Sequence, residues 1–208
     1  MSVASDERAA LIALMEAVGP DAPTLCEGWL TRDLAAHLIV RERRPDAAPG
    51  ILIKPLAGLT ERAMREYAAR PWPELLRLLR DGPPAWSPFA LDAISDRVNV
   101  VEFFVHHEDI RRSVPDWQPR QPDGRRDAAL WKLLGRMGRL LYRRCPVGVV
   151  VRRPDGAEHA VRSGQRAVVA VGEPGELVLH AYGRDQVRLD VHGEPAAVHA
   201  FQRSPRGL

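Results

Sequence analysis

The sequence predicts an α+β fold in which a helical bundle over residues 1–145 is followed by a small α/β domain over residues 146–208. Before Cys145, apolar residues recur at the spacing of amphipathic helices, whereas short β-branched runs separated by turn signals follow it. Apolar residues make up 45% of the 208 positions, which is enough to bury a core. We therefore expect a folded protein with four principal helices and a domain boundary near Cys145.

The first two helices are predicted from apolar periodicity and from residues that start or stop a helix. Residues 6–18 carry apolar side chains at helical spacing, and Gly19 follows as a terminator. A second helix begins at Thr31, which can cap it, and ends before Pro45, because the residue preceding a proline disfavours helical geometry. This second helix carries His37.

The rest of the predicted bundle contains an excursion and two longer helices. Residues 46–88 are punctuated by prolines and glycines, with shorter helical runs at 59–69 and 73–80. A long helix is predicted over residues 91–112, and Asp123 can open a fourth helix.

The predicted second domain alternates strands and short helices. VGVVVRR, EHAVR and RAVVAVG read as three strands, and QVRLDVHG as a fourth. Pro174 suits the first turn of a helix that Gly183 ends, and PAAVHAF follows the last strand.

Composition narrows the class of function. The 30 basic and 27 acidic residues are interspersed and leave a formal charge of +3, so we expect no nucleic-acid partner. No apolar run approaches the roughly 18 residues of a membrane span, and the first residues lack the order of a secretory signal, so we expect a cytoplasmic protein. Cys26 and Cys145 are far apart and are expected to be reduced thiols.

The long third helix carries ionisable residues on the face that should be inward. Helical projection places Glu102 and His106 together in an otherwise apolar stripe, and places His107 on the opposite face, where we expect it at the surface. An ionisable group inside a bundle costs free energy unless it is paired or binds a metal.

The second helix offers a third donor for the same position. His37 lies in a partly apolar stripe, so two imidazole nitrogens and one carboxylate would meet between the helices. This donor set suits zinc, or another divalent metal, with a position open for water or substrate. The alternative is a hydrogen-bonded cluster of Glu102 and the two histidines without a metal.

Three neighbouring residues allow two interpretations each. Asp109 is either a charge at the end of the helix or the group that orients an imidazole ligand. Arg41 either binds an anionic substrate or neutralises Glu102 or Asp33. Cys26 is either a reactive thiol or a buried structural cysteine.

Two segments carry a resemblance to a known family. TLCEGWLTRDLAAHLIVRERRPDA and NVVEFFVHHEDIRR resemble the DinB-like superfamily, in the branch that contains mycothiol-dependent maleylpyruvate isomerase and an uncharacterised actinobacterial metal-binding family. The resemblance implies a DinB-like four-helix bundle. It also implies that one histidine of the second helix and a Glu-x-x-x-His pair of the third bind zinc, which correspond to His37, Glu102 and His106.

The resemblance further implies thiol chemistry. Relatives use the metal to activate a low-molecular-weight thiol, mycothiol, which attacks an electrophile, while the C-terminal domain closes one side of a cleft. Arg184 in HAYGRDQ is similar to an arginine that assists thiol or substrate binding. The GPPAWSP segment departs from the isomerase, which argues for a different cleft wall and against maleylpyruvate itself as the substrate.

We therefore expect a mycothiol-dependent transferase or isomerase that acts on a small electrophilic substrate. Arg184, Arg41 and Asp109 are its candidate catalytic residues. The alternative function is a non-catalytic, metal-stabilised binding or regulatory module. The outward projection of Phe104 indicates either internal packing or a dimer contact, so the expected state is a monomer or a homodimer.

Overall fold

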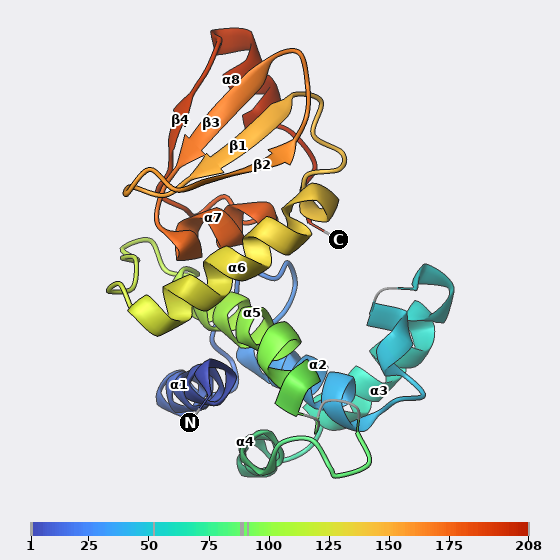
Figure 1. The fold of residues 1–208 in the computed structure, drawn as a ribbon. Coiled ribbons are helices and arrows are strands. Elements are labelled where there is room, and N and C mark those ends of the chain that lie inside the picture. Colours follow the sequence, from blue (N-terminus) through green and yellow to red (C-terminus); the bar gives the residue numbers. More distant parts are fainter. Residues whose placement is uncertain (1, 52, 88–89, 91, 208) are drawn as a thin grey trace. The chain divides into compact units, whose positions relative to one another are not determined.

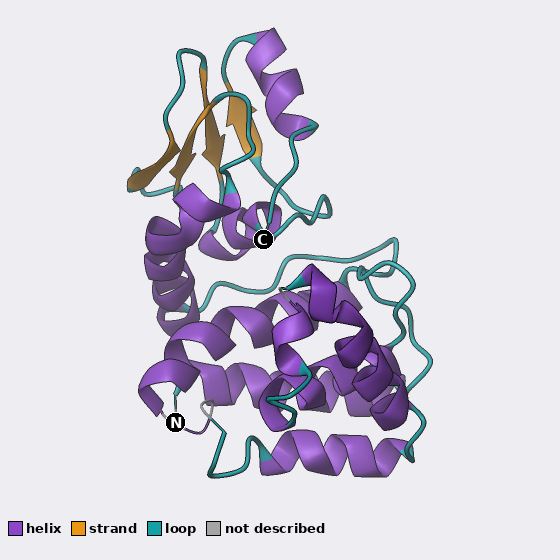
Figure 2. Cartoon of the chain, turned by 90° about the vertical axis from the view of Figure 1, so that its right-hand side faces the viewer, coloured by secondary structure: helices purple, strands orange, loops and turns teal. Residues whose placement is uncertain are grey.

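The computed structural model describes residues 2–51, 53–87, 90 and 92–207, with the side chains of residues 92–98 outside the description. Contacts divide the chain into two compact units, Met1–Trp117 and Gln118–Leu208. The first unit is built of helices and loops, and the sheet lies in the second (Figures 1 and 2). The predicted α+β class is confirmed.

The division between the units differs from the predicted boundary near Cys145. Helix α6 (Gly124–Leu141) packs against α7 (Pro174–Ala181) and β2 (Glu158–Arg162), so it belongs to the second unit. The reason is that the periodic pattern of a helix shows which face is buried but not which element covers that face. A bundle that counts α6 among its four helices stays a prediction.

The first unit contains the predicted helices of the N-terminal part. They are α1 (Val3–Val18), α2 (Thr31–Arg43), α3 (Ala57–Ala68), α4 (Trp72–Asp81) and α5 (Asp92–Arg111), with short 3-10 turns η1 (Ala48–Ile51) and η2 (Lys54–Leu56). Helix α1 packs along α5, and α2 packs against α3 and α4. The predicted start of the long helix, Leu91, lies outside the described residues.

The ends of α1 and α2 follow from local hydrogen bonds. The Ser2 hydroxyl accepts from the backbone N–H of Ser5, and α1 ends at Gly19, whose φ of 79° suits glycine. The prediction that Thr31 caps α2 was wrong. Leu30 occupies the cap position with its N–H bonded to Asp33, while the Thr31 hydroxyl donates to the Gly19 carbonyl and ties the preceding loop to the helix.

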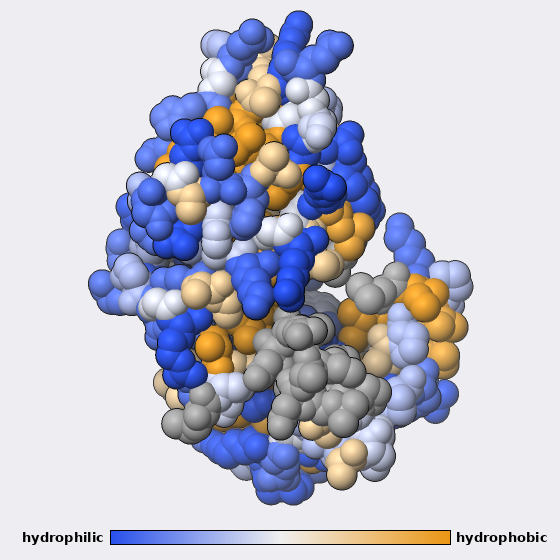
Figure 3. Space-filling model, in the orientation of Figure 1, coloured by the Kyte–Doolittle hydropathy of each residue, from blue (hydrophilic) through white to orange (hydrophobic). Residues whose placement is uncertain are grey.

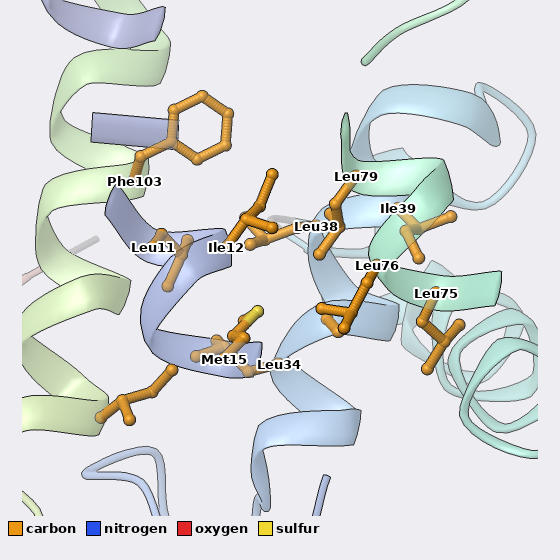
Figure 4. Close-up of a cluster of buried hydrophobic side chains, with 12 residues drawn as sticks. Leu11, Ile12, Met15, Leu34, Leu38, Ile39, Leu75, Leu76, Leu79 and Phe103 are labelled. Carbon is orange, nitrogen blue, oxygen red and sulfur yellow. The ribbon is translucent and has the colours of Figure 1, made fainter. Parts of the chain in front are cut away.

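Apolar side chains from four helices form the core of the first unit. Figure 4 shows side chains of α1, α2 and α4 meeting in one cluster, which Phe103 of α5 joins. The buried members of this cluster are Leu11, Ile12, Met15, Leu34, Ala35, Leu38, Ile39, Leu75, Leu76, Leu79, Phe103 and Ile110. The core therefore fixes α2 against its neighbours on the side where α2 carries apolar residues.

The second unit is a four-stranded sheet with three helices. Its elements besides α6, α7 and β2 are β1 (Gly148–Arg152), β3 (Ala167–Val171), β4 (Asp190–His192) and α8 (Pro195–Gln202). The strand order is β2-β1-β3-β4, with β1 and β3 parallel and both outer pairs antiparallel. Asp123 caps α6 as predicted, since its carboxylate accepts from two backbone N–H groups at 2.9 Å.

The structure bears on three further expectations, which concern the side chain of Phe104, membrane-spanning helices and the two cysteines. Phe104 is 2% exposed, so it packs inside the protein and is not an exposed dimer contact. Apolar side chains reach the surface around η2 and the start of α3, where Ile53, Leu56 and Leu59 are exposed (Figure 3). Among the described residues, no helix combines the length and apolar character that crossing a membrane requires. Cys26 and Cys145 are thiols, not a disulfide, as predicted.

Candidate metal centre

Helices α2 and α5 bring the three predicted ligands together. His37 lies in the middle of α2, and Glu102 and His106 lie about one turn apart on α5. Glu102 Oε1 lies 3.0 Å from His37 Nε2 and 3.3 Å from His106 Nε2. One donor atom of each residue lies within 4.8 Å of the other two. Both helices thus direct these side chains at one point, and the role of the three residues as metal ligands stays a prediction.

The cluster is buried at its histidines and more open at its carboxylate. His37 is 6% exposed and His106 9%, whereas the Glu102 side chain is 23% exposed. The two imidazole rings meet edge to face, with centroids 5.2 Å apart. Solvent therefore reaches the cluster on the side of Glu102.

Burial and hydrogen bonding set the protonation of the three residues. Burial lowers the pKa of His37 and favours its neutral form. Burial alone would raise the pKa of Glu102, but hydrogen bonds from His106 and His37 and the charge of Arg41 outweigh it and hold that pKa well below its ordinary value. Burial likewise opposes a proton on His106, but hydrogen bonds to Asp109, Cys26 and Glu102 raise its pKa well above the ordinary value.

Asp109 lies behind His106 on the side away from Glu102. Its Oδ2 lies 2.9 Å from His106 Nδ1, while His106 Nε2 faces Glu102, and the Asp109 side chain is fully buried. The sequence left Asp109 either as a charge at the end of the helix or as a group that orients an imidazole, and the structure contains the contact with an imidazole, that of His106. A carboxylate on the second nitrogen of an imidazole fixes the tautomer and leaves the first nitrogen as an electron-pair donor.

Arg41 lies beside the carboxylate of the cluster. Its Nε is 3.6 Å from Glu102 Oε1, and its Nη1 donates to Asn99 Oδ1 at 2.6 Å. Arg41 is 8% exposed and Asn99 is fully buried. The guanidinium therefore offsets the charge of Glu102, whereas Asp33 bonds to the backbone of Leu30.

Arg184 belongs to the second unit and is described within it. Its backbone N–H donates to the carbonyl of Leu179 at the end of α7, and its Nη1 donates to the carbonyl of Tyr182 at 2.7 Å. A role for Arg184 in catalysis stays a prediction. The GPPAWSP segment ends at Pro88, which lies outside the described residues, so the predicted change in the cleft wall also stays a prediction.

His107 was expected at the surface, and that expectation was wrong. The side chain is buried, and its Nδ1 lies 3.9 Å from Glu7 Oε2 of α1. The opposite face of α5 is covered because α1 packs along it. His107 nevertheless points away from the cluster of His37, Glu102 and His106, as projection required.

Sequence reasoning missed two contacts made by the loop before α2. The Cys26 thiol donates to Asp109 Oδ2 at 3.2 Å, and Cys26 with His106 and Asp109 forms a second group of donors within 4.8 Å. The ring of Trp29 lies against that of His37, with centroids 5.2 Å apart and an interplanar angle of 47°. A loop has no periodicity that predicts side-chain direction. The only available signal was that Cys26 and Trp29 shortly precede the helix that carries His37.

The donor set fits a divalent metal. Neutral imidazole and ionised carboxylate are the forms that bind metal, and these are the forms that the pKa shifts favour at His37 and Glu102. Two nitrogens and a carboxylate oxygen are a common zinc set, and a carboxylate behind one imidazole is its usual support. His106 would release its additional proton when a metal binds.

Comparison with known proteins finds similarity in structure and not in sequence. No protein-family model and no curated protein matches the chain. A crystal structure of a histidine-to-alanine mutant of mycothiol-dependent maleylpyruvate isomerase matches with a TM-score of 0.61 at 14% identity, and one of mycothiol-dependent maleylpyruvate isomerase matches with a TM-score of 0.54 at 16% identity. Each match covers 92% of this chain and 90% of the other. The fold of the chain is therefore similar to that of mycothiol-dependent maleylpyruvate isomerase, as the resemblance implied.

Proposed function

We propose that the chain binds one divalent metal ion, zinc, through His37, Glu102 and His106. The observation that carries the proposal is the convergence of His37 Nε2 and His106 Nε2 on Glu102 Oε1 between two helices, with Asp109 behind His106. A purely structural cluster could satisfy the same groups by hydrogen bonds. The carboxylate behind one imidazole favours the metal, because it supports a ring whose other nitrogen acts as a ligand.

The proposed activity is that of a cytoplasmic transferase or isomerase in which mycothiol is the thiol and a small electrophile is the substrate. The support is the fold, which matches crystal structures of a protein whose name states a dependence on mycothiol. Zinc with an open position would hold a bound thiol as its nucleophilic thiolate. The chain's own part is to hold the ion through His37, Glu102 and His106 and to fix the ring of His106 through Asp109.

Two arginines are proposed to manage charge in this reaction. Arg41, at 3.6 Å from Glu102, offsets the charge of the carboxylate and keeps it ionised. Arg184 is proposed to neutralise an anionic group of the thiol or the substrate, on the strength of the HAYGRDQ resemblance alone. The two proposals can be tested one at a time, because Arg41 lies in the first compact unit and Arg184 in the second.

An open metal position distinguishes this function from a fully coordinated, non-catalytic module. Asp109 contacts the Nδ1 side of His106, whereas the donors that converge on Glu102 are Nε2 atoms. Glu108, another carboxylate of α5, accepts from Arg112 at 2.6 Å and from Arg111 at 2.8 Å. Of the described side chains of α5, neither of these two carboxylates is aimed at the point where the three donors meet, which supports an open metal position.

The metal proposal is tested by elemental analysis of the purified full chain after loading with zinc and removal of the excess. We expect about one zinc per wild-type chain and a large loss in the His106→Ala variant. His107→Ala is the matched control, because it removes the adjacent buried imidazole that points away and should retain the ion. Wild-type protein that holds no stoichiometric metal would remove the proposal.

The thiol proposal is tested separately by titrating mycothiol into the zinc-loaded protein in a calorimeter. We expect heat of binding in the loaded wild type and none in the His106→Ala variant, because the thiol would bind through the ion. A loaded protein that gives neither heat nor added thermal stability would eliminate the transferase and isomerase proposals and leave the metal-stabilised module.

A further inference from the structure

One loop supports both candidate histidine ligands from outside the helices. This support loop, residues 24–29, places Trp29 against the ring of His37 and the Cys26 thiol at 3.2 Å from Asp109 Oδ2. The backbone of the loop is also bound to α5, since the Leu25 N–H donates to the Asp109 carbonyl at 3.0 Å. The loop therefore contacts the candidate site at two independent points.

Internal hydrogen bonds fix the shape of the support loop. The Thr24 hydroxyl donates to the Trp29 carbonyl at 2.9 Å and accepts from the Cys26 N–H at 3.1 Å. The Trp29 N–H donates to the Cys26 carbonyl at 2.9 Å, and Gly28 turns the chain with a φ of 76°. These bonds fix the backbone at Cys26, from which the side chain reaches Asp109.

The Cys26 thiol and the His106 ring meet at the same oxygen of Asp109. Asp109 Oδ2 lies 3.2 Å from Cys26 Sγ and 2.9 Å from His106 Nδ1, and the carboxylate is fully buried. A buried carboxylate needs donors to stay in one orientation, and losing one lets it rotate or leaves it less satisfied. A thiol is a weak donor, so the expected effect on the orientation of His106 is modest but specific.

We propose that Cys26 is a positioning residue: its thiol holds Asp109, and Asp109 holds His106 with Nε2 directed at the metal. The inference rests on the proposed metal centre. It assigns the cysteine neither as a ligand nor as a nucleophile, because its Sγ lies on the Nδ1 side of His106, 4.0 Å from that nitrogen, whereas Nε2 is the nitrogen that faces Glu102. Replacing the thiol should therefore change metal affinity without emptying the site.

The test is the dissociation constant for zinc of the full chain, measured by competition with a chromophoric chelator. Loss of one modest hydrogen bond should weaken binding about five-fold in Cys26→Ala, whereas Cys26→Ser keeps a donor and should bind within about two-fold of wild type. Cys145→Ala is the matched control, since it removes a fully buried cysteine in the other unit and should leave affinity unchanged. The thermal stability of each metal-free variant establishes that it is folded.

A second measurement separates positioning from a general packing effect. In an Asp109→Ala background, where binding should already be about ten- to hundred-fold weaker, Cys26→Ala should add little, because the shorter contact of the thiol, 3.2 Å, is with Asp109 and its contact with His106 Nδ1 is 4.0 Å. The absorption bands of bound Co²⁺ should shift in Cys26→Ala and return in Cys26→Ser. Wild-type affinity in Cys26→Ala, or an equal loss in both backgrounds, would overturn the inference while leaving the metal centre intact. A wild-type chain that binds no zinc would overturn both.

Discussion

His106 in the first unit and His180 in the second are buried to a similar extent, but their pKa values are shifted in opposite directions. His106 is 9% exposed and His180 is 6% exposed. His180 Nδ1 lies 2.8 Å from the Tyr142 hydroxyl, and its ring stacks on Phe201. Burial, and then the charge of Arg206, lowers the pKa of His180 to about 3, whereas the pKa of His106 is raised well above its ordinary value.

The difference lies in the partners that burial brings to each ring. His180 meets a phenol, which can donate a hydrogen bond to a neutral imidazole but carries no charge to balance a proton. His106 meets the carboxylates of Glu102 and Asp109, which stabilise either a proton or a metal ion. A buried histidine by itself is therefore a packing feature. Convergent carboxylates are what make the cluster at His106 a candidate for metal binding.

Zinc should stabilise the protein through one of these two regions and not the other. At a free zinc concentration about a thousand times the dissociation constant, the free energy of unfolding should rise by about 4 kcal/mol in wild type. His37→Ala should lose most of this increment, because only two of the three proposed ligands, Glu102 and His106, remain. His180→Asn should retain it, because His180 lies in the other unit. Urea unfolding with zinc and with chelator measures both increments.

The result that would break the comparison is an equal zinc increment in wild type and His37→Ala. Zinc would then act elsewhere, and the cluster on α2 and α5 would be a hydrogen-bonded core. Loss of the increment in His180→Asn alone would point to the second unit instead.

Acid should destabilise the protein through His180, with the sign set by its lowered pKa. The folded pKa is about 3, against an ordinary value of 6.5 in the unfolded chain. Well above pH 6.5 the ring is neutral in the folded and the unfolded chain and does not change the free energy of unfolding. Below pH 6.5 the unfolded chain binds a proton at His180, whereas the folded chain binds it only when the pH approaches 3. Stability should therefore fall by about 2 kcal/mol between neutral pH and pH 5 from this group.

The measurement is urea unfolding of metal-free wild type and His180→Asn across that pH range. Asparagine offers Oδ1 as an acceptor for the Tyr142 hydroxyl but does not titrate. The free energy of unfolding of His180→Asn should therefore decline by about 2 kcal/mol less than that of wild type. His199→Asn, at an exposed position of the same unit, is the control and should follow wild type. Parallel curves for wild type and His180→Asn would show that His180 is not the acid-sensitive group.

Helical periodicity explains why much of the candidate site was predictable. A residue on a helix has a fixed direction, so the placement of Glu102 and His106 on one face, and of His107 on another, could be read from spacing. The same reasoning could not predict that His107 is buried, because burial depends on α1 covering the second face of α5. It also could not place Cys26, whose direction comes from the folded loop.

The fold shows the same limit at the scale of elements. Strands and helices of the second unit follow from alternation, turn signals and residues such as Asp123 and Pro174. The boundary does not, because α6 has an apolar stripe that would suit either unit, and only the three-dimensional contacts with α7 and β2 assign it. Local chemistry therefore predicts elements well, whereas the choice of packing partner depends on the whole chain.

The smallest expected effect separates burial from hydrogen bonding as the reason that His180 is neutral. Tyr142→Phe keeps the ring that packs in this core but removes the donor to His180 Nδ1, which should lower the free energy of unfolding at neutral pH by about 1 kcal/mol. Burial and the charge of Arg206 depress the pKa without help from the phenol, so the loss of stability toward acid should remain as steep as in wild type. Urea unfolding at each pH measures both quantities. A flat acid response in Tyr142→Phe would mean that the partner, and not burial, sets the protonation of His180, and the contrast with His106 would then rest on hydrogen bonds alone.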